Sequence, residues 1–271
     1  MARDIWCIDN LIDSAAVTAD SAVTALGPTR VKDPRLGRVW RPVATTATLT
    51  ATFAQPSQVD IVMAILRGHS GSGRVTLKLF SGAGSSTPDI FSGAIDNAVD
   101  PTLQMMIWIA ERDAPSKVFF PTPPDPAPPV GPTTAKLALT ITGGVLDVAR
   151  VWAGKAVWRP MVNHILGSGQ GVTDMSRVQT TPRAGAVFTD SAVRLRSQSP
   201  NYDAIDVTEW AGPVDALART AGVAKQCFFV PDFEYYNPHI AAIMGYQQEI
   251  SPIIASGWRR FQRAFAIQES G

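Results

Sequence analysis

Short runs of alternating apolar and polar residues constrain this chain more than any other feature of its sequence. Residues 74–80 (RVTLKLF) alternate strictly, with a valine and two leucines at every second position. Residues 46–53 and 136–142 repeat the pattern. Successive side chains of a β-strand point to opposite faces of its sheet, so alternation of period two indicates half-buried strands.

Further strand candidates extend along the whole chain. Glycine and serine clusters at 68–73 and 81–86 supply turns between the early runs. Several short strands with turns between them are typical of a β-sandwich or jelly roll, so the sequence predicts a mainly β fold. The remaining strand candidates are residues 61–66, 105–109, 192–196, 226–230, 240–246 and 261–268.

Segment 115–132 (PSKVFFPTPPDPAPPVGP) breaks the strand pattern with prolines. Proline fixes φ and lacks the N–H donor of a sheet ladder, so this segment is predicted to be a long extended loop and not a central strand. Phe119 and Phe120 within it are candidate interface residues, because a bare apolar tip promotes aggregation. We expect them to pack on the sandwich itself or on an adjacent subunit.

The tetrapeptide Val-Trp-Arg-Pro occurs twice, at residues 39–42 and 157–160. A repeat and a chance match explain it equally well. Because the copies bracket the strand-rich region, we expect Trp40 and Trp158 to be buried near the border of two modules. The chain then divides into an N-terminal segment, a β-sandwich and a smaller C-terminal α+β module, which the N-terminal segment is expected to join. Their boundaries are residues 1–45, 46–160 and 161–271.

One main helix is predicted, at residues 209–221. Asp206 is a candidate N-cap, and Glu209 three residues later completes a capping box. Gly222 marks the end of the helix, where a left-handed residue is common. The face predicted to be buried consists of Trp210, Val214, Leu217, Ala218 and Ala221.

Composition narrows the functional classes. Hydrophobic residues make up 45% of the chain and charged residues only 17%, which argues against disorder and leaves much surface to be covered by partners. A net charge of +1 gives no attraction to nucleic acid or anionic membranes. The apolar runs are too short to span a bilayer, and no signal peptide is visible, so synthesis in the cytosol is expected. Cys7 and Cys227 lie in apolar surroundings and are predicted to be buried free thiols.

The sequence lacks the common motifs of catalytic sites. There is no G-x-S-x-G elbow and no Walker A lysine motif. His69, His164 and His239 lack metal-ligand spacing, so no metal, cofactor or enzymatic activity is expected. The pair Tyr235 and Tyr236 follows Pro-Asp in a predicted loop, and loop-borne aromatic residues with a polar tip are typical of interfaces.

Three segments resemble proteins of the tail tip of tailed bacteriophages. Residues 26–42 (LGPTRVKDPRLGRVWRP) and 148–160 (VARVWAGKAVWRP) look like conserved motifs of such tail proteins. Residues 226–269 are similar to their closing module, with an apolar strand ending in Pro-Asp and a final strand rich in arginine and aromatic residues. The resemblance is to the distal tail protein type of baseplate component, although the order of its parts differs: here the sandwich precedes the helix-bearing module.

This resemblance implies a structural virion protein assembled in the host cytoplasm. It implies a galectin-like or jelly-roll sandwich, a ring-forming module, self-association into a ring (a hexamer favoured, a trimer possible) and contacts with tail-tube and tail-hub proteins. Arginine forks pair well with carboxylates of a neighbouring subunit, so Arg259, Arg260 and Arg263 are candidate interface residues. The alternative reading is a carbohydrate-binding sandwich that attaches to host-surface glycans; its tryptophans are suited to stacking on sugars.

Overall fold

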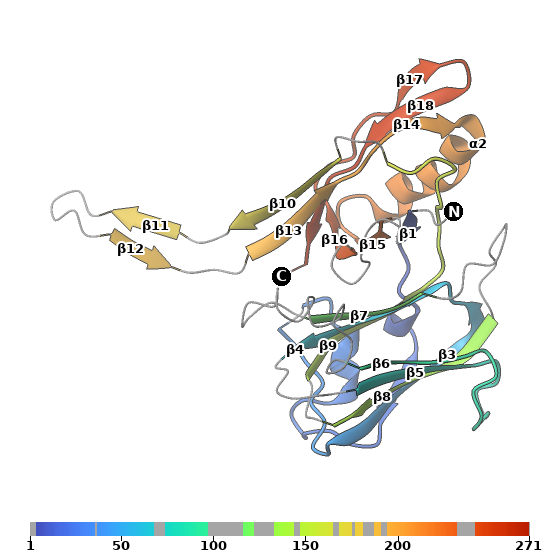
Figure 1. Ribbon diagram of the computed structural model, residues 1–271, viewed down its shortest axis with the longest axis vertical. Helices are drawn as coiled ribbons and strands as arrows, with labels where there is room; N and C mark the ends of the chain where they lie inside the picture. The colour runs from blue at the N-terminus through green and yellow to red at the C-terminus, as the bar shows by residue number, and fades with distance from the viewer. Residues whose placement is uncertain are drawn as a thin grey trace.

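The computed structural model assigns this chain a mainly β architecture in stacked layers (Figure 1). Two of the layers form the predicted β-sandwich, and a C-terminal α+β module follows. The structure describes residues 4–35, 37–67, 74–96, 116–121, 133–143, 147–164, 168–174, 177–180, 187–190, 194–231 and 242–270. The strand candidate 105–109 lies outside these residues.

The outer layer of the sandwich is a five-stranded antiparallel sheet. Its inward side chains are the alternating apolar residues of the sequence pattern; Leu49, Leu77 and Leu139 meet there in one buried cluster. The strand at residues 74–80 is confirmed with the predicted bounds. In spatial order the strands are β2 (Ala16–Ala19), β3 (Thr46–Gln58), β8 (Thr133–Thr142), β5 (Arg74–Phe80) and β6 (Phe91–Asp96).

The second layer is a three-stranded sheet that is covered on both faces. Its order is β7 (Ser116–Pro121), β4 (Ile61–Arg67) and β9 (Asp147–Gly154). Val62 on β4 faces the outer sheet, while its neighbour Met63 belongs to a second cluster on the opposite face. Burial on both faces explains why residues 61–66 are continuously apolar and do not alternate.

A six-stranded antiparallel sheet forms the third layer. Phe228 and Met244 pack against Met63 of the middle sheet, so one apolar cluster joins the sandwich to the C-terminal module. The strands in order are β1 (Ile5–Cys7), β15 (Gln226–Val230), β16 (Ile243–Gln247), β19 (Ile267–Glu269), β13 (Arg194–Ser199) and β10 (Gly169–Asp174).

The far face of this sheet is covered by a helix and by a three-stranded sheet. The helix begins as α2 (Val207–Glu209) and continues through the wide turns η3 (Trp210–Val214) and η4 (Leu217–Ala221). The capping box is confirmed, and the helix ends at Gly222 with φ of 53°. Val214, Leu217 and Ala221 are buried as predicted, but Trp210 is 37% exposed. The small sheet consists of β14 (Asn201–Asp206), β18 (Arg260–Ala264) and β17 (Ile254–Gly257).

The N-terminal segment is divided between the two parts of the molecule. β1 pairs with β15 of the C-terminal sheet, whereas β2 pairs with β3 of the sandwich. Between and after these strands, the short helices η1 (Leu11–Asp13) and η2 (Pro28–Lys32) pack on β9. Both tryptophans of the repeated tetrapeptide are buried as expected, but in different cores: Trp40 in the sandwich and Trp158 beneath the helix.

Two predicted elements are corrected. Residues 261–268 do not form one strand: β18 ends at Ala264 and β19 begins at Ile267 in another sheet. The partner strands β13 and β14 change sheets at Pro200, and Phe265 N–H donates to the Pro200 carbonyl, so both pairs bend together. The start of the proline-rich loop forms β7, an edge strand, where proline is tolerated.

Candidate functional site

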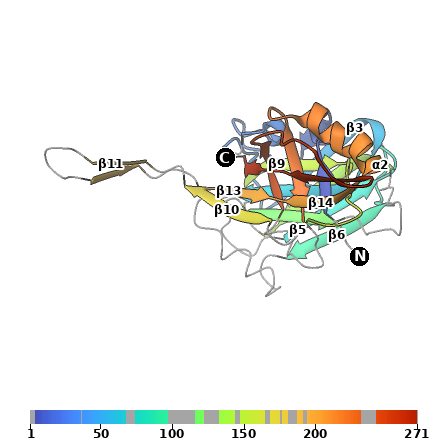
Figure 2. The same ribbon diagram turned by 90° about the horizontal axis from the view of Figure 1, so that it is seen from above.

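A long β-hairpin arm projects from the C-terminal module (Figure 1, Figure 2). Its base is the β10–β13 pair, which runs from Gly169↔Ser199 to Asp174↔Arg194. Its outer part is formed by β11 (Arg177–Thr180) and β12 (Val187–Asp190), which pair with each other and, within the part of the chain that the structure describes, with no third strand. A two-stranded hairpin by itself is marginally stable in water, and its open edges are ready templates for another chain.

A second projecting element is the β17–β18 hairpin. Gly257 pairs with Arg260, so Trp258 and Arg259 form a two-residue loop at its tip. Trp258 is 91% exposed, and Ile254 on β17 is 52% exposed. Arg259 has φ of 58°, a left-handed conformation that is strained for a long side chain.

The base of this hairpin is held firmly by its own module. Phe261 stacks on Trp210 with ring centroids 4.8 Å apart. Arg263 is buried and lies over the ring of Phe265, at 4.7 Å from its centroid; burial lowers the pKa of its guanidinium. Arg263 therefore lies in the interior and not at the surface, whereas Arg259 and Arg260 are exposed at the tip.

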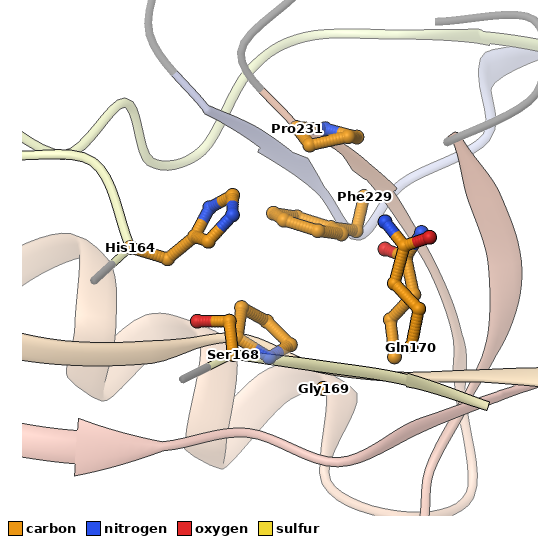
Figure 3. A pocket seen from close by; sticks show the side chains of 8 residues that line it. His164, Ser168, Gly169, Gln170, Phe229 and Pro231 are labelled. Atoms are coloured by element: carbon orange, nitrogen blue, oxygen red, sulfur yellow. The ribbon is translucent and has the colours of Figure 1, made fainter. Parts of the chain in front are cut away.

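A pocket of about 210 Å³ lies where β10, β13 and β15 meet the loop before β10 (Figure 3). Phe229, Pro200 and Pro231 supply its apolar wall. The polar lining consists of one imidazole, one hydroxyl and two amide side chains. They belong to His164, Ser168, Gln170 and Gln198, and the backbone of Gly169 lies between them.

His164 is fixed by a buried hydrogen-bond network. Its Nδ1 lies 2.8 Å from a carboxylate oxygen of Asp4, which also accepts from the backbone N–H of His164 and, at 2.7 Å, from the Tyr202 hydroxyl. Trp6 Nε1 donates to the Tyr202 oxygen. Burial, and then the Asp4 carboxylate, raise the pKa of Tyr202 well above its usual value. The network supports the pocket wall as a rigid unit.

The sequence could not have indicated this site. Asp4 and His164 are 160 residues apart, so no spacing motif links them. Ser168 is likewise held in place, because its hydroxyl accepts from the backbone N–H of Asn201 at 3.0 Å. No local signal in the sequence marks Trp258 as exposed.

The other candidate interface residues fall partly outside the described structure. Phe119 and Phe120 pair through their backbones with Met63 and Val62, but their side chains lie outside the description. Tyr235 and Tyr236 lie outside it altogether. Cys7 and Cys227 are buried free thiols, as predicted. No helix in the described residues is long and apolar enough to cross a membrane.

Comparison with known proteins gives no family. No family model and no curated protein matches the chain. Several solved structures are similar at low level. A family 32 carbohydrate-binding module of Clostridium perfringens NanJ, in complex with galactose, is 10% identical over 56% of this chain and 100% of that chain, with a TM-score of 0.37. The family 32 module of AlyQ, in complex with 4,5-unsaturated mannuronic acid, is 16% identical over 55% and 98%, with a TM-score of 0.38.

A Ruminococcus gnavus GH29 fucosidase, in complex with fucose, is 12% identical over 55% of this chain and 27% of that chain, with a TM-score of 0.39. None of these three structures is a phage tail protein. At such TM-scores the similarity carries no argument about what this chain does.

Proposed function

We propose that this chain is a structural subunit that assembles with copies of itself and with other proteins through its projecting elements. The observation that carries the proposal is the arm: β11 and β12 extend from the body and, among the residues that the structure describes, pair with no third strand. Such a hairpin gains its stability when another chain covers it. A contact between the arm of one copy and the body of the next generates a ring or a filament when it is head-to-tail, that is, when the two copies do not exchange it reciprocally.

The assembly we propose is the tail tip of a tailed bacteriophage, with the chain as a distal-tail type baseplate component that joins the tail tube to tip proteins. The resemblance of three sequence segments to such proteins supports this reading. The same proposal implies assembly in the host cytoplasm and residence in the virion. The low charged fraction fits a protein whose surface is largely covered by partners.

Shortening the arm tests the proposal. Asp174 and Arg194 are paired, so replacing residues 175–193 with Asn-Gly closes the β10–β13 hairpin with a favourable two-residue turn. We expect this variant to keep its circular dichroism and melting temperature and to associate more weakly than the parent in sedimentation velocity. A matched control replaces only residues 181–186 with Asn-Gly, which keeps β11 and β12 and is expected to assemble like the parent. A parent protein that stays monomeric at high concentration, alone and with tail proteins, would overturn the proposal.

The second candidate function is carbohydrate binding by the sandwich, for attachment to host-surface glycans. The solved structures named above include carbohydrate-binding modules with bound sugars. Their TM-scores are too low to argue for this function, but the bound sugars suggest which probes to use. A glycan array and calorimetry on the purified chain, with galactose and fucose as probes, separate the two functions. Saturable sugar binding by a protein that remains monomeric would favour the alternative.

A further inference from the structure

Trp258 presents an unusual surface. It is 91% exposed, more than any other large apolar residue in the described part of the chain. Indole rings are among the side chains that contribute most when buried in an interface, and arginine is the other enriched type. Two arginines, Arg259 and Arg260, follow directly, and residues 250–264 contain no acidic residue.

The β17–β18 hairpin that carries Trp258 is held in one conformation before any partner binds. β18 pairs with β14 along its length, and Phe261 stacks on Trp210, so the base cannot move freely. The left-handed Arg259 fixes the turn in a conformation that costs free energy for a non-glycine residue. A strained tip on a rigid base loses little conformational freedom on binding.

The same chain carries a pocket that matches this tip. Its volume is about 210 Å³, and a cavity of about 150 Å³ is enough to bind benzene. Phe229, Pro200 and Pro231 offer an apolar wall to an aromatic ring, while the amide and hydroxyl oxygens of Gln170, Gln198 and Ser168 are of the type that accepts an indole N–H.

Charge also favours the match. Among the described residues, the pocket lining holds no lysine or arginine that would repel the tip arginines, and the buried carboxylate of Asp4 lies behind His164. Since Trp258 is exposed, it does not occupy the pocket of its own chain. Trp258 (the knob) and the His164–Phe229 pocket (the hole) therefore lie on different surfaces of one molecule. A head-to-tail contact between copies requires this arrangement.

We propose that Trp258 of one copy seats in the His164–Phe229 pocket of a second copy, with Arg259 and Arg260 at its rim. With this contact, the partner in the proposed assembly is a second copy of the chain. The inference therefore rests on the proposed role as a structural subunit. It is separate from the arm contact, so each can fail alone. Copies joined by a head-to-tail contact add to one another until the ring closes. A change to either the knob or the hole removes one of the two binding surfaces of each copy.

Two variants of the full chain test the contact. Trp258→Ser removes the knob at a fully exposed tip. Gln170→Trp fills the hole from an exposed position on the edge strand β10. We expect each variant to keep its melting temperature and to lose at least tenfold in association constant by sedimentation velocity. An equimolar mixture is expected to regain association, because the intact hole of one variant accepts the intact knob of the other.

The control is Val43→Ser, which removes an apolar side chain that is 67% exposed on the sandwich and is expected to assemble like the parent. Tryptophan fluorescence gives a second readout: the parent should shift to the blue with rising concentration, and Trp258→Ser should not. Normal assembly by both variants, or a mixture no better than either alone, overturns the contact while leaving the arm proposal intact. A blue shift that needs phosphatidylcholine–phosphatidylglycerol vesicles and not a second copy would assign the tip to lipid and also overturn it.

Discussion

Single residues at the centre of the C-terminal module connect the pocket to the core. Tyr202 is fully enclosed and stands between Trp6, whose indole N–H donates to its hydroxyl, and Asp4, which accepts from it. Asp4 in turn holds His164 at the pocket wall. The position of His164 therefore depends on a chain of buried hydrogen bonds that starts at β1.

Tyr202→Phe tests that dependence. The substitution keeps the ring but leaves the Trp6 donor and one Asp4 acceptor site without the hydroxyl between them. Loss of a buried partner costs about 1–3 kcal/mol, so we expect a decrease of that size in the free energy of unfolding by urea denaturation. Tyr246→Phe, on a partly exposed tyrosine, is the control and should change stability little. An unchanged stability of Tyr202→Phe would show that the network adds nothing.

The two thiols give a pH-dependent prediction. Burial raises the pKa of Cys227 to about 12 from 9.0, and it raises the pKa of Cys7 further. Because the unfolded thiols ionise first, the stability they contribute is complete below pH 9 and decreases as the pH rises from 9 toward 12. We expect native protein at pH 8 to resist Ellman's reagent and to react only at the rate of unfolding. Fast reaction of either thiol in folded protein would contradict this.

At the scale of elements, the helix start links the module together. Glu209 completes the capping box by accepting from Asp206 N–H, and its other oxygen accepts from Trp158 Nε1 and Met161 N–H. One side chain thus caps the helix and fixes the chain where it leaves the sandwich. The sequence pattern indicates only the first of these roles.

Replacing each cap residue separates the two roles. Glu209→Ala leaves the buried indole N–H and a backbone N–H without acceptors, and we expect a loss of about 1–3 kcal/mol. Asp206→Ala removes only the bonds to Thr208 at the helix start and should cost less. Thermal unfolding followed by circular dichroism measures both. Equal losses in the two variants would mean that Glu209 acts as a helix cap alone.

At the scale of the molecule, Arg150 ties the sandwich to the C-terminal sheet. It lies on β9 and is 2% exposed. Its guanidinium donates to Asp13 at 2.7 and 2.9 Å, to the carbonyl of Lys32, and to Gln226 on β15 at 3.3 Å. The two parts share this group in addition to the apolar cluster around Met63 and Phe228.

Arg150→Met should weaken that junction. Methionine keeps much of the apolar stem but leaves the buried acceptors without a donor, so we expect about 1–3 kcal/mol of lost stability in urea denaturation. Arg219→Met is the matched control: this arginine is 80% exposed and pairs with Asp215 at the surface, so its effect should be small. The proposal of a shared junction is contradicted if the control is the more damaging change.

The two tryptophans of the repeated tetrapeptide serve separate cores, so each core can be probed alone. Trp40→Ala should destabilise the sandwich, and Trp158→Ala the module beneath the helix, each by about 3–5 kcal/mol for a buried aromatic side chain. Near-ultraviolet circular dichroism and urea denaturation measure the two losses. A variant that unfolds like the parent would show that its tryptophan is not part of a packed core.

The sequence by itself determined what depends on neighbours along the chain. Alternation at residues 74–80, the apolar run at 226–230 and the capping box at Asp206 predicted elements that the structure contains. A spacing of two, or of three to four, between apolar residues is a property of a single strand or helix. A short window of sequence is therefore enough to reveal it.

Only the tertiary structure decided which surfaces meet. The break of the last strand near Phe265, the pairing of Asp4 with His164, the exposure of Trp258 and the arm built from a glycine- and threonine-rich segment all depend on contacts between residues far apart in the chain. The pairing of strands and the choice of buried face are fixed by the closure of whole layers around shared cores, and no short window of sequence contains that information.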